Sequence, residues 1–457
     1  MKPKKKDFPL EEYLYPPLVN IIDMNHPLVK LADAIDWSKL EEIFGSLYHE
    51  KKGRPGISIR LMIGLHYLKY TYNMSDVEVL NRWLENPYWQ YFTGEKVFQK
   101  ELPIDSSSMT KFRKRLKEKE LDELLSETIR VGFSEGYLKK EDISEVAVDT
   151  TVQEKEIKYP TDIQLYYDFI VLLNRYRKQK GMKLKNSYEK SCKKLLRKYS
   201  GYIHAKQFKR AAKVLKRVRT RSLRLYREIE KRLLDYEKSE EEFLKLKDYY
   251  ESLKERKRSS KNKLYSLWAP EVECISKGKL HKRYEFGVKT GIVSSLSKGF
   301  VFSCKVFSGN PYDGHTLSDN LSDAEERLRF FGKIRRAFVD LGYRKHDYEG
   351  EVDVVVVPKN LQRFDDLLKR KMKRRSVIEA VISHMKRMCR FDKNKLHGRM
   401  GDKINAVFSA IGHNLRLLLA FFSFVLFFGA EKDGVLSFYR ILLVIVTTIV
   451  EFKTVCL

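Results

Sequence analysis

Cysteine is scarce in this chain of 457 residues. Its five cysteines form no CxxC pair and no Cys/His cluster with the spacing of a zinc site. The scarcity argues against a disulfide framework and a structural zinc, and it predicts a reducing, cytoplasmic setting. The first 17 residues are basic and lack the apolar core of a signal peptide.

Acidic residues are in deficit, with 61 Asp and Glu against 90 Lys and Arg, a formal net charge of +29. A surplus of this size favours a polyanionic partner, nucleic acid first and an anionic membrane surface second. Hydrophobic residues make up 43% of the chain and aromatics 12%. The chain can therefore build a packed core, and its length predicts about two or three domains.

Long hydrophobic runs are confined to the C-terminal end, at residues 417–430 and 441–450. Each is shorter than the roughly 18–20 residues that a bilayer-spanning helix needs. We predict that residues 416–457 form a hydrophobic tail that packs against the protein or a partner subunit. Membrane insertion is one alternative, and a tail that has lost its partner surface or its reading frame is another.

Residues 1–135 have the pattern of a helical N-terminal domain. A breaker, GRPG at 53–56, precedes an apolar-periodic stretch, and Ser75 with Glu78 has the spacing of a capping box. Several short helices with tight turns and a basic last helix suit a helix-turn-helix-like DNA-binding module. An ordinary helical domain with a solvated basic face fits the pattern equally well.

Residues 206–227 carry ten Lys or Arg and no acid. Apolar residues recur there at helical spacing, at 208, 212, 215, 218 and 225, and leave the basic residues on the other faces. A charge run is usually a solvated face, but same-sign charges repel one another unless a phosphate backbone neutralises them. We therefore expect DNA contacts from Lys209, Arg210, Lys213, Arg217 and Arg221.

Residues 140–415 alternate between strand and helix patterns. A strand at 144–157 contains Asp149, and a helical insertion of many charges follows at about 160–265. Two further strands, a helix, a short strand that ends at Asp340, another strand and a long helix follow. This order predicts an α/β domain, a mixed sheet layered with helices.

Three acids of this α/β segment form a candidate metal site. Asp149 and Asp340 each follow a short apolar run, so we expect each at a strand end. Glu379 shares one helical stripe with Arg375 and Lys386. Two alternatives stay open: aspartate commonly stops strands, and Arg375–Glu379 fits a surface ion pair.

Phosphodiester chemistry gives a reason for three such acids to be held together. Two divalent cations about 4 Å apart can activate the attacking oxygen and stabilise the leaving one. Mg²⁺ prefers oxygen ligands and needs only a few carboxylates. Arg375 and Lys386 would then hold the flanking DNA phosphates.

The chain resembles bacterial insertion-sequence transposases of the DDE class, the InsH-type or "IS-five" group, over most of its length. The stretch at 57–94 looks like the family's N-terminal domain. Several ordered motifs are far more specific than any single acid. The stretches that carry the resemblance are AVDTTVQEKEIKYPTD, LYSLWAPEVECISKGKLHKRYEFGVK, GNPYDGHTL, FVDLGYR and RRSVIEAVISHMKR, followed by GDKINAVFSAIGHNLRLLL.

The resemblance implies an RNase H-like fold in which Asp149, Asp340 and Glu379 bind two Mg²⁺ or Mn²⁺ ions. It also implies DNA strand cleavage and strand transfer at the ends of an insertion sequence, by a homodimer or a larger assembly. The family's signature places a tyrosine three residues before the arginine, where this chain has Met372. The alternatives are a catalytically inactive, DNA-binding transposase remnant and a membrane protein anchored by its tail.

Overall fold

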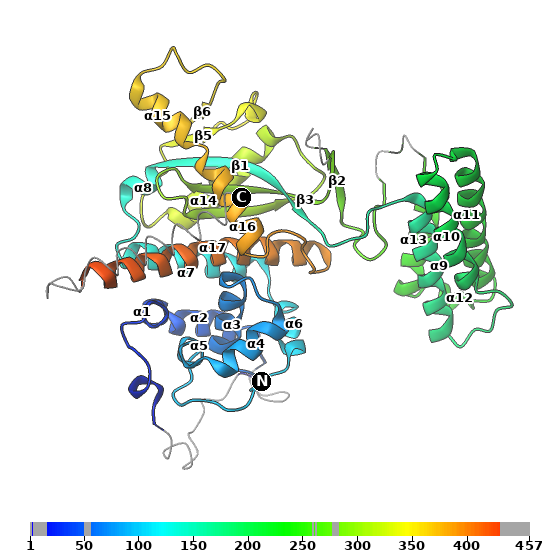
Figure 1. Cartoon of the computed structure of the whole chain (residues 1–457), viewed down its shortest axis with the longest axis horizontal. Helices are drawn as coiled ribbons and strands as arrows, with labels where there is room; N and C mark the ends of the chain where they lie inside the picture. Colours follow the sequence, from blue (N-terminus) through cyan, green and yellow to red (C-terminus); the bar gives the residue numbers. More distant parts are fainter. Residues whose placement is uncertain are drawn as a thin grey trace.

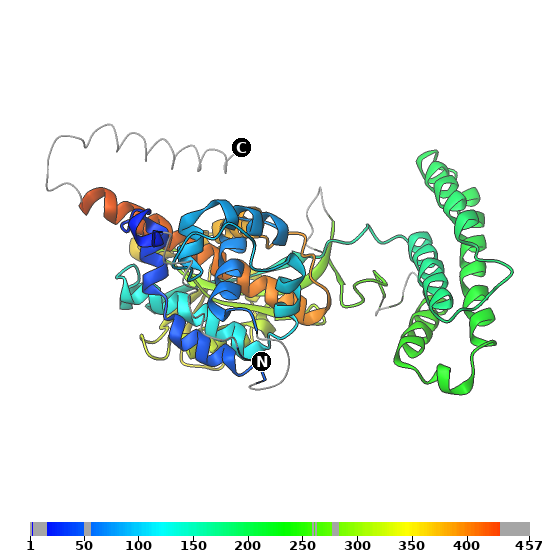
Figure 2. The same cartoon turned by 90° about the horizontal axis from the view of Figure 1, so that it is seen from below.

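The computed structural model describes residue 2 and residues 16–49, 56–257, 260, 263–276 and 283–429. Most of the predicted tail, from residue 430 on, lies outside the described residues. A main body holds a sheet and most of the helices, and a separate group of helices projects from it (Figures 1 and 2).

Within the described residues, six strands form one mixed sheet. The central strand β1 (Glu145–Glu154) pairs antiparallel with β3 (Tyr284–Ser295) and parallel with β5 (Arg336–Val339). β5 pairs parallel with β6, while β2 and β4 share the other edge of β3, both antiparallel. Their bounds are β2 (Glu273–Ser276), β4 (Val301–Phe307) and β6 (Asp353–Val356). The predicted mixed α/β architecture is confirmed.

Two local predictions are wrong, and one strand was not predicted. Segment Glu273–Ser276 is an unpredicted strand, because four residues carry too little pattern to reveal a distant partner. Asp149 lies in the middle of β1, since pairing with β3 extends the strand to Glu154. The predicted long helix is two helices, α15 (Asp366–Arg374) and α16 (Val377–Met388). The break lets Met372 and Ile378 both enter the core, although an unbroken helix would point them about 120° apart.

The N-terminal helices and the sheet share one hydrophobic core, with α17 (Gly398–Gly429) between them (Figure 1). α17 packs against α3, α7 and β4. Gly412 allows its close approach to α3, since a Cβ there would lie 2.7 Å from the Tyr70 backbone. The helices are α1 (Pro27–Ala34), α2 (Trp37–Gly45), α3 (Ile59–Thr71), α4 (Asp76–Glu85), α5 (Pro87–Phe92), α6 (Ser106–Arg113) and α7 (Glu118–Ser134), after a 3-10 turn η2 (Leu18–Asn20).

The predicted capping box at the start of α4 is confirmed. Ser75 Oγ accepts from the Glu78 N–H at 3.2 Å, and Glu78 Oε2 accepts from the Ser75 N–H at 2.6 Å. Both N–H groups, which have no partner within the helix, are thereby satisfied.

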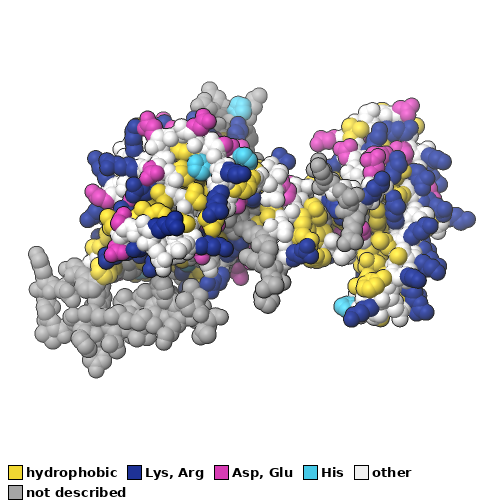
Figure 3. All heavy atoms as spheres, turned by 90° about the horizontal axis from the view of Figure 1, so that it is seen from above, with side chains coloured by type: hydrophobic (Ala, Val, Ile, Leu, Met, Phe, Trp, Pro, Cys, Tyr) yellow, Lys and Arg dark blue, Asp and Glu magenta, His cyan; other side chains and the backbone are white. Residues whose placement is uncertain are grey.

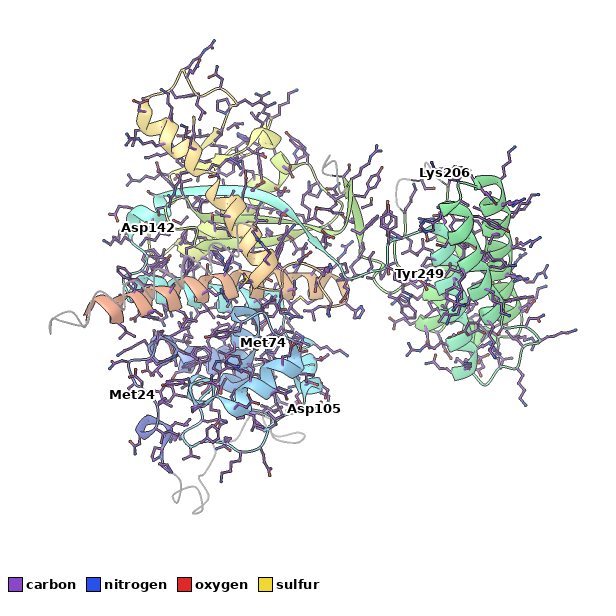
Figure 4. The ribbon with its side chains drawn as sticks, viewed as in Figure 1. Met24, Met74, Asp105, Asp142, Lys206 and Tyr249 are labelled. Atoms are coloured by element: carbon purple, nitrogen blue, oxygen red, sulfur yellow. The ribbon has the colours of Figure 1, made fainter. Side chains whose placement is uncertain are left out.

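The helical insertion has a core of its own. It comprises α9 (Asp162–Gln179), α10 (Glu189–His204), α11 (Phe208–Glu230), α12 (Asp235–Lys238) and α13 (Glu241–Lys254). Its buried residues, among them Phe169, Tyr226 and Tyr249, form a cluster separate from that of the main body. Figure 4 shows Tyr249 at the side of the insertion that faces the main body.

A buried ammonium group clamps the two ends of the insertion. Lys155, directly after β1, lies 2.9 Å from Glu271, just before β2, and 2.6 Å from Asp402 in α17. Asn394 donates to the same Asp402 oxygen at 2.7 Å. Burial raises the pKa of Asp402 to about 6, although Lys155 opposes the shift. One cation therefore ties the end of β1 to the segment that returns from the insertion and to α17.

Residues 417–422 of the predicted tail lie on α17, where Leu418 and Phe422 belong to the main core. By length and composition, the stretch Gly398–Leu426 could cross a membrane, with a mean hydropathy of 1.5, but half of its apolar window is buried inside the protein.

His66 in α3 is held neutral by its surroundings. Its Nδ1 lies 2.7 Å from the Met62 carbonyl oxygen, and its Nε2 lies 3.3 Å from Arg113 Nη1. A carbonyl only accepts and a guanidinium only donates, so Nδ1 carries the proton and Nε2 does not. Burial, assisted by the charge of Arg113, lowers the pKa of His66 to about 3.

We predict that His66 makes the fold sensitive to acid. A lowered folded-state pKa contributes stability that is present above the unfolded-state pKa of about 6.5 and is lost as the pH falls. Between pH 7 and pH 5 this side chain alone should remove ~2 kcal/mol from the free energy of unfolding. Urea unfolding at both pH values should show a smaller loss for His66→Gln, which cannot titrate; equal losses would contradict the prediction.

Candidate active site

Asp149 lies in β1, and Asp340 directly follows β5, the parallel neighbour of β1. In the register of β1 with β5, Ala147 is level with Phe338. Asp149 and Asp340 each come two residues after this last paired position, and residues two apart on a strand point to the same face of a sheet. Such strands are about 4.8 Å apart. The structure therefore brings two of the three predicted acids together.

Asp340 also shapes the turn that follows it. It caps the 3-10 turn η4 (Leu341–Tyr343) by accepting a hydrogen bond of 2.8 Å from the N–H two residues later. The turn buries the ring of Tyr343. Burial, followed by the charges of Asp149, Asp313 and Asp340, raises the pKa of this phenol well above its usual range. The charges of three carboxylates thus act on one buried hydroxyl.

Asp313 is an acid of this site that the sequence analysis misses. It begins the 3-10 turn η3 (Asp313–Thr316), just before α14 (Leu317–Leu328). Its Oδ1 accepts from Thr150 Oγ1 at 2.7 Å and from Lys289 Nζ at 2.9 Å. In the sequence it has the pattern of a turn within GNPYDGHTL. Only the pairing of β1 with β3 brings it beside Thr150, the neighbour of Asp149.

Glu379, in the first turn of α16, is joined to the other acids through Arg375. Arg375 Nη2 lies 2.7 Å from Glu379 Oε1, and Nη1 lies 3.9 Å from Asp149 Oδ2. The Glu379 side chain is 61% exposed and that of Arg375 15%. The predicted i,i+4 pair forms, but its guanidinium is buried against β1. Within the described ranges, no three His, Cys, Asp or Glu side chains are close enough to hold a metal ion together.

α16 is fixed against the sheet on the side away from Glu379. Gly299, in the turn between β3 and β4, has a φ of +66°, and a Cβ there would lie 3.0 Å from Val381. His384 and His413 share a hydrogen bond of 2.7 Å between their Nδ1 atoms. His413 Nε2 lies 3.0 Å from the Gly299 carbonyl oxygen, so it donates there and accepts from His384. These contacts set the position from which Glu379 projects.

The basic residues predicted to contact DNA fall into two regions. Lys386 lies on α16, two turns after Glu379. Lys209, Arg210, Lys213 and Arg217 are exposed on α11 of the insertion. Lys and Arg side chains line the outer edge of this insertion (Figure 3).

Two details of α11 differ from the prediction. Arg221 is partly buried over the Tyr188 ring, with Nη1 3.2 Å from Ser191 Oγ. Val218 and Leu225 of the predicted apolar face are buried, but Phe208 and Ala212 are exposed, because at the start of the helix the buried face is shifted by one position. The residues that are buried are Ala211, Val214, Val218, Ser222, Leu225, Tyr226 and Ile229.

Comparisons with known proteins identify the family. Residues 16–115 match the family described as Transposase domain (DUF772), and residues 255–415 match the family described as Transposase DDE domain. The second match includes Asp313, Asp340 and Glu379. The chain belongs to the insertion-sequence DDE transposases.

One curated relative matches less than half of the chain. An uncharacterized protein, ORF8 in the nfe locus of Rhizobium meliloti, is 44% identical over 188 residues, which are 41% of this chain and 90% of that protein. No solved structure matches the chain.

We predict that the carboxylate of Asp313 stabilises the site. The Lys289 side chain is only 10% exposed and would lose its one acidic partner in Asp313→Asn, with the Pro311 carbonyl at 2.6 Å remaining. An underpaired buried ammonium group costs roughly 1–3 kcal/mol. The midpoint of urea unfolding should fall accordingly.

Asp319→Asn is the matched control for Asp313→Asn. Asp319 pairs with Lys305 at 3.0 Å on the surface, so its loss should change the free energy of unfolding by less than about 0.5 kcal/mol. Equal effects of the two changes would mean that Asp313 is an ordinary surface acid.

Proposed function

We propose that the protein is an active DNA transposase that binds the ends of an insertion sequence and catalyses strand cleavage and strand transfer. The observation that carries this proposal is the position of Asp149 in β1 and of Asp340 directly after β5, the parallel neighbour of β1, in a chain that belongs to the DDE transposases. An aspartate that only ended strand β5 would not have to lie beside the strand that carries Asp149.

The strand arrangement supports the RNase H-like fold that the resemblance implies. β4, β3 and β1 form an antiparallel set, and β5 and β6 extend it in parallel on the far side of β1. This order places the first strand at the centre of the sheet. Acids on β1 and after β5 therefore meet at one place.

The donor set suits a hard divalent cation. Carboxylate oxygens are the ligands that Mg²⁺ and Mn²⁺ prefer, and the charges of Asp149, Asp313 and Asp340 all act on one buried phenol. Asp149, Asp340 and Glu379 would hold such ions. When bound, the ions would supply charge stabilisation for the attacking and the leaving oxygens of a phosphodiester.

Arg375 has two roles in this proposal. Its guanidinium neutralises Asp149 and Glu379 in the structure, which limits the repulsion among the acids. A cation bound by the same carboxylates would repel it. Arg375 would then be available for a DNA phosphate, to which a guanidinium can donate two hydrogen bonds. Lys386 would contact the same strand further along α16.

DNA is the expected partner of the other basic surfaces. The exposed cations of α11 extend the positive charge well away from the acids, which suits contact with DNA outside the cleaved bond. Paired cutting of two ends requires at least a homodimer. We expect the protein to act in the cytoplasm, and the burial of α17 supports packing over membrane insertion.

The alternative, an inactive DNA-binding remnant, depends on Met372. That side chain is 3% exposed and belongs to the main core. The replacement of tyrosine by methionine is therefore a change at a packed core position. Its burial favours the active protein over the remnant.

Asp340→Asn tests the proposed chemistry directly. The change keeps the size of the side chain and its bond to the turn, but removes the charge that would hold the metal. Mg²⁺-dependent nicking of a terminal-repeat duplex should fall by at least about a hundredfold, while duplex binding and thermal stability stay near those of the unchanged protein. Asp149→Asn and Glu379→Gln should behave alike, and double variants should be no worse, because residues that act as one unit are not additive.

Two results would contradict this assignment. Nicking that survives in Asp340→Asn within a few-fold would remove this residue from the active site. Absence of nicking in the unchanged protein, with normal DNA binding, would favour the inactive remnant.

The insertion can be tested separately through the salt dependence of DNA binding. Each phosphate contact contributes a slope of about 0.9 to the fall of log affinity with log salt. Changing Lys209, Arg210, Lys213 and Arg217 to glutamine should flatten that slope by roughly 2–4. Arg221 is left in place because it packs on Tyr188. An unchanged slope would mean that the exposed cations of α11 face solvent and do not contact DNA.

A further inference from the structure

A basic pocket lies where the N-terminal helices meet the C-terminal end of α16. It has a volume of about 300 Å³. Lys69 and Asn73 enter it from α3 and the loop after it, Lys386 and Arg390 from α16 and the loop after that helix. Figure 4 shows Met74, the neighbour of Asn73, at this junction.

The lining of this pocket is strongly positive. Six of its twelve residues are Lys or Arg and two are acids, which leaves a surplus of four positive charges. Lys395 lies 3.4 Å from Glu156, so one acid is already paired at the rim. Such a surplus in a concave site concentrates anions.

The walls of the pocket are held in place across the junction. Asn73 Nδ2 donates to the Arg387 carbonyl oxygen at 3.1 Å, and Arg390 Nη1 donates to the Asn73 carbonyl oxygen at 3.3 Å. Of the seven non-glycine residues with positive φ in the described part of the chain, Asn73, Arg390 and Lys393 all line this pocket. Strained backbone gathers where a ligand must be clamped.

Lys69 closes the inner end of the pocket. It is 5% exposed, and its Nζ lies 2.7 Å from Asp76 Oδ1. Asp76 is shared with Arg113, whose Nη2 lies 2.6 Å from its second oxygen. One carboxylate therefore serves two buried cations. Burial, partly opposed by Asp76, lowers the pKa of Lys69 to about 8. An anion bound beside Lys69 would therefore stabilise its charged form.

The pocket is aligned with the candidate active site. Lys386 lies seven residues after Glu379, which is two turns of α16 and therefore the same face. At about 1.5 Å per residue, the two side chains start about 10 Å apart along the helix. A DNA strand rises about 3.4 Å per nucleotide. A DNA strand that runs along α16 would therefore reach the pocket about three nucleotides from the phosphodiester bond that lies at the acids of the candidate active site.

We propose that this pocket binds a backbone phosphate of the DNA strand that enters the active site, about three nucleotides from the cleaved bond, and that it thereby joins the N-terminal helices to α16 on the DNA. The proposal rests on the proposed function for the identity of the polyanion. It assigns a phosphate-binding role to Arg390, Lys393 and Lys395. These residues are additional to Arg375 and Lys386, which share a helical face with Glu379.

The first test measures the affinity for a duplex of about 30 base pairs at several salt concentrations. The variant is Lys393→Gln with Lys395→Gln, two exposed side chains at the pocket. Loss of one or two phosphate contacts should reduce the salt slope by roughly 1–2. The control is Lys333→Gln. Lys333 is an exposed lysine that pairs with Glu351. It lies just before the start of β5, whereas Asp340 follows the end of that strand. The control change should leave the slope unchanged.

The second test locates the phosphate. In duplexes that carry the end of the element, single phosphates are replaced by uncharged methylphosphonates. Replacement about three nucleotides from the cleaved bond should weaken binding by the unchanged protein and have no further effect on the double variant. A uniform effect at every position, or the same positional profile in both proteins, would overturn the proposal.

Two further measurements distinguish a DNA phosphate from a small free anion. If inorganic phosphate at constant ionic strength protects the protein from heat and the double variant keeps the full DNA slope, the pocket takes a small free anion and the proposal is wrong. If the unchanged protein shows no salt-dependent binding to DNA, the proposed function itself fails. Circular dichroism and the thermal midpoint of the double variant check that its fold is intact.

Discussion

The ammonium group of Lys155 is the interaction on which the assembly of this protein depends. It meets Glu271 and Asp402 in a buried site and so joins the end of the central strand, the chain that returns from the insertion, and the first turns of α17. Removal of one partner from a buried ion pair costs roughly 3–5 kcal/mol, because a charge is left uncompensated. Burial raises the pKa of Asp402, so it disfavours the charged carboxylate, and the attraction of Lys155 opposes this effect. The geometry of β1, and with it Asp149, is set at this point.

α17 converts that clamp into a rigid main body. Its residues contribute to the same core as the N-terminal helices and the sheet. The N-terminal helices and the sheet that carries the acids pack into one core, so their relative orientation is fixed by packing. For the proposed DNA cleavage, this fixed orientation would keep the N-terminal helices and the acids at a set spacing.

The sequence predicted the features that depend on local pattern. The capping box of Ser75 and Glu78, the mixed sheet and the pairing of Arg375 with Glu379 all follow from spacing over a few residues. What it could not predict depends on distant pairing. Asp149 looked like a strand end because the partner that extends β1 lies beyond the insertion. Asp313 looked like a turn residue because its contacts, Thr150 and Lys289, are set by the same pairing. The buried side at the start of α11 was missed, since packing partners rather than the helix's own periodicity decide which side is buried there.

The insertion also has a consequence for how the chain folds. Glu154 and Gly287 are direct partners in the sheet although more than a hundred residues separate them. Closing so long a loop as a flexible chain is slow, because its conformational entropy must be lost before the strands gain any contact. The helices between them make mostly local contacts and form a core of their own. They can collapse first and bring the two strand ends together, so that the insertion acts as an internal tether for the sheet. A segment that projects from the main body of the finished protein (Figure 1) would thus shorten the search for the native sheet while the chain is folding.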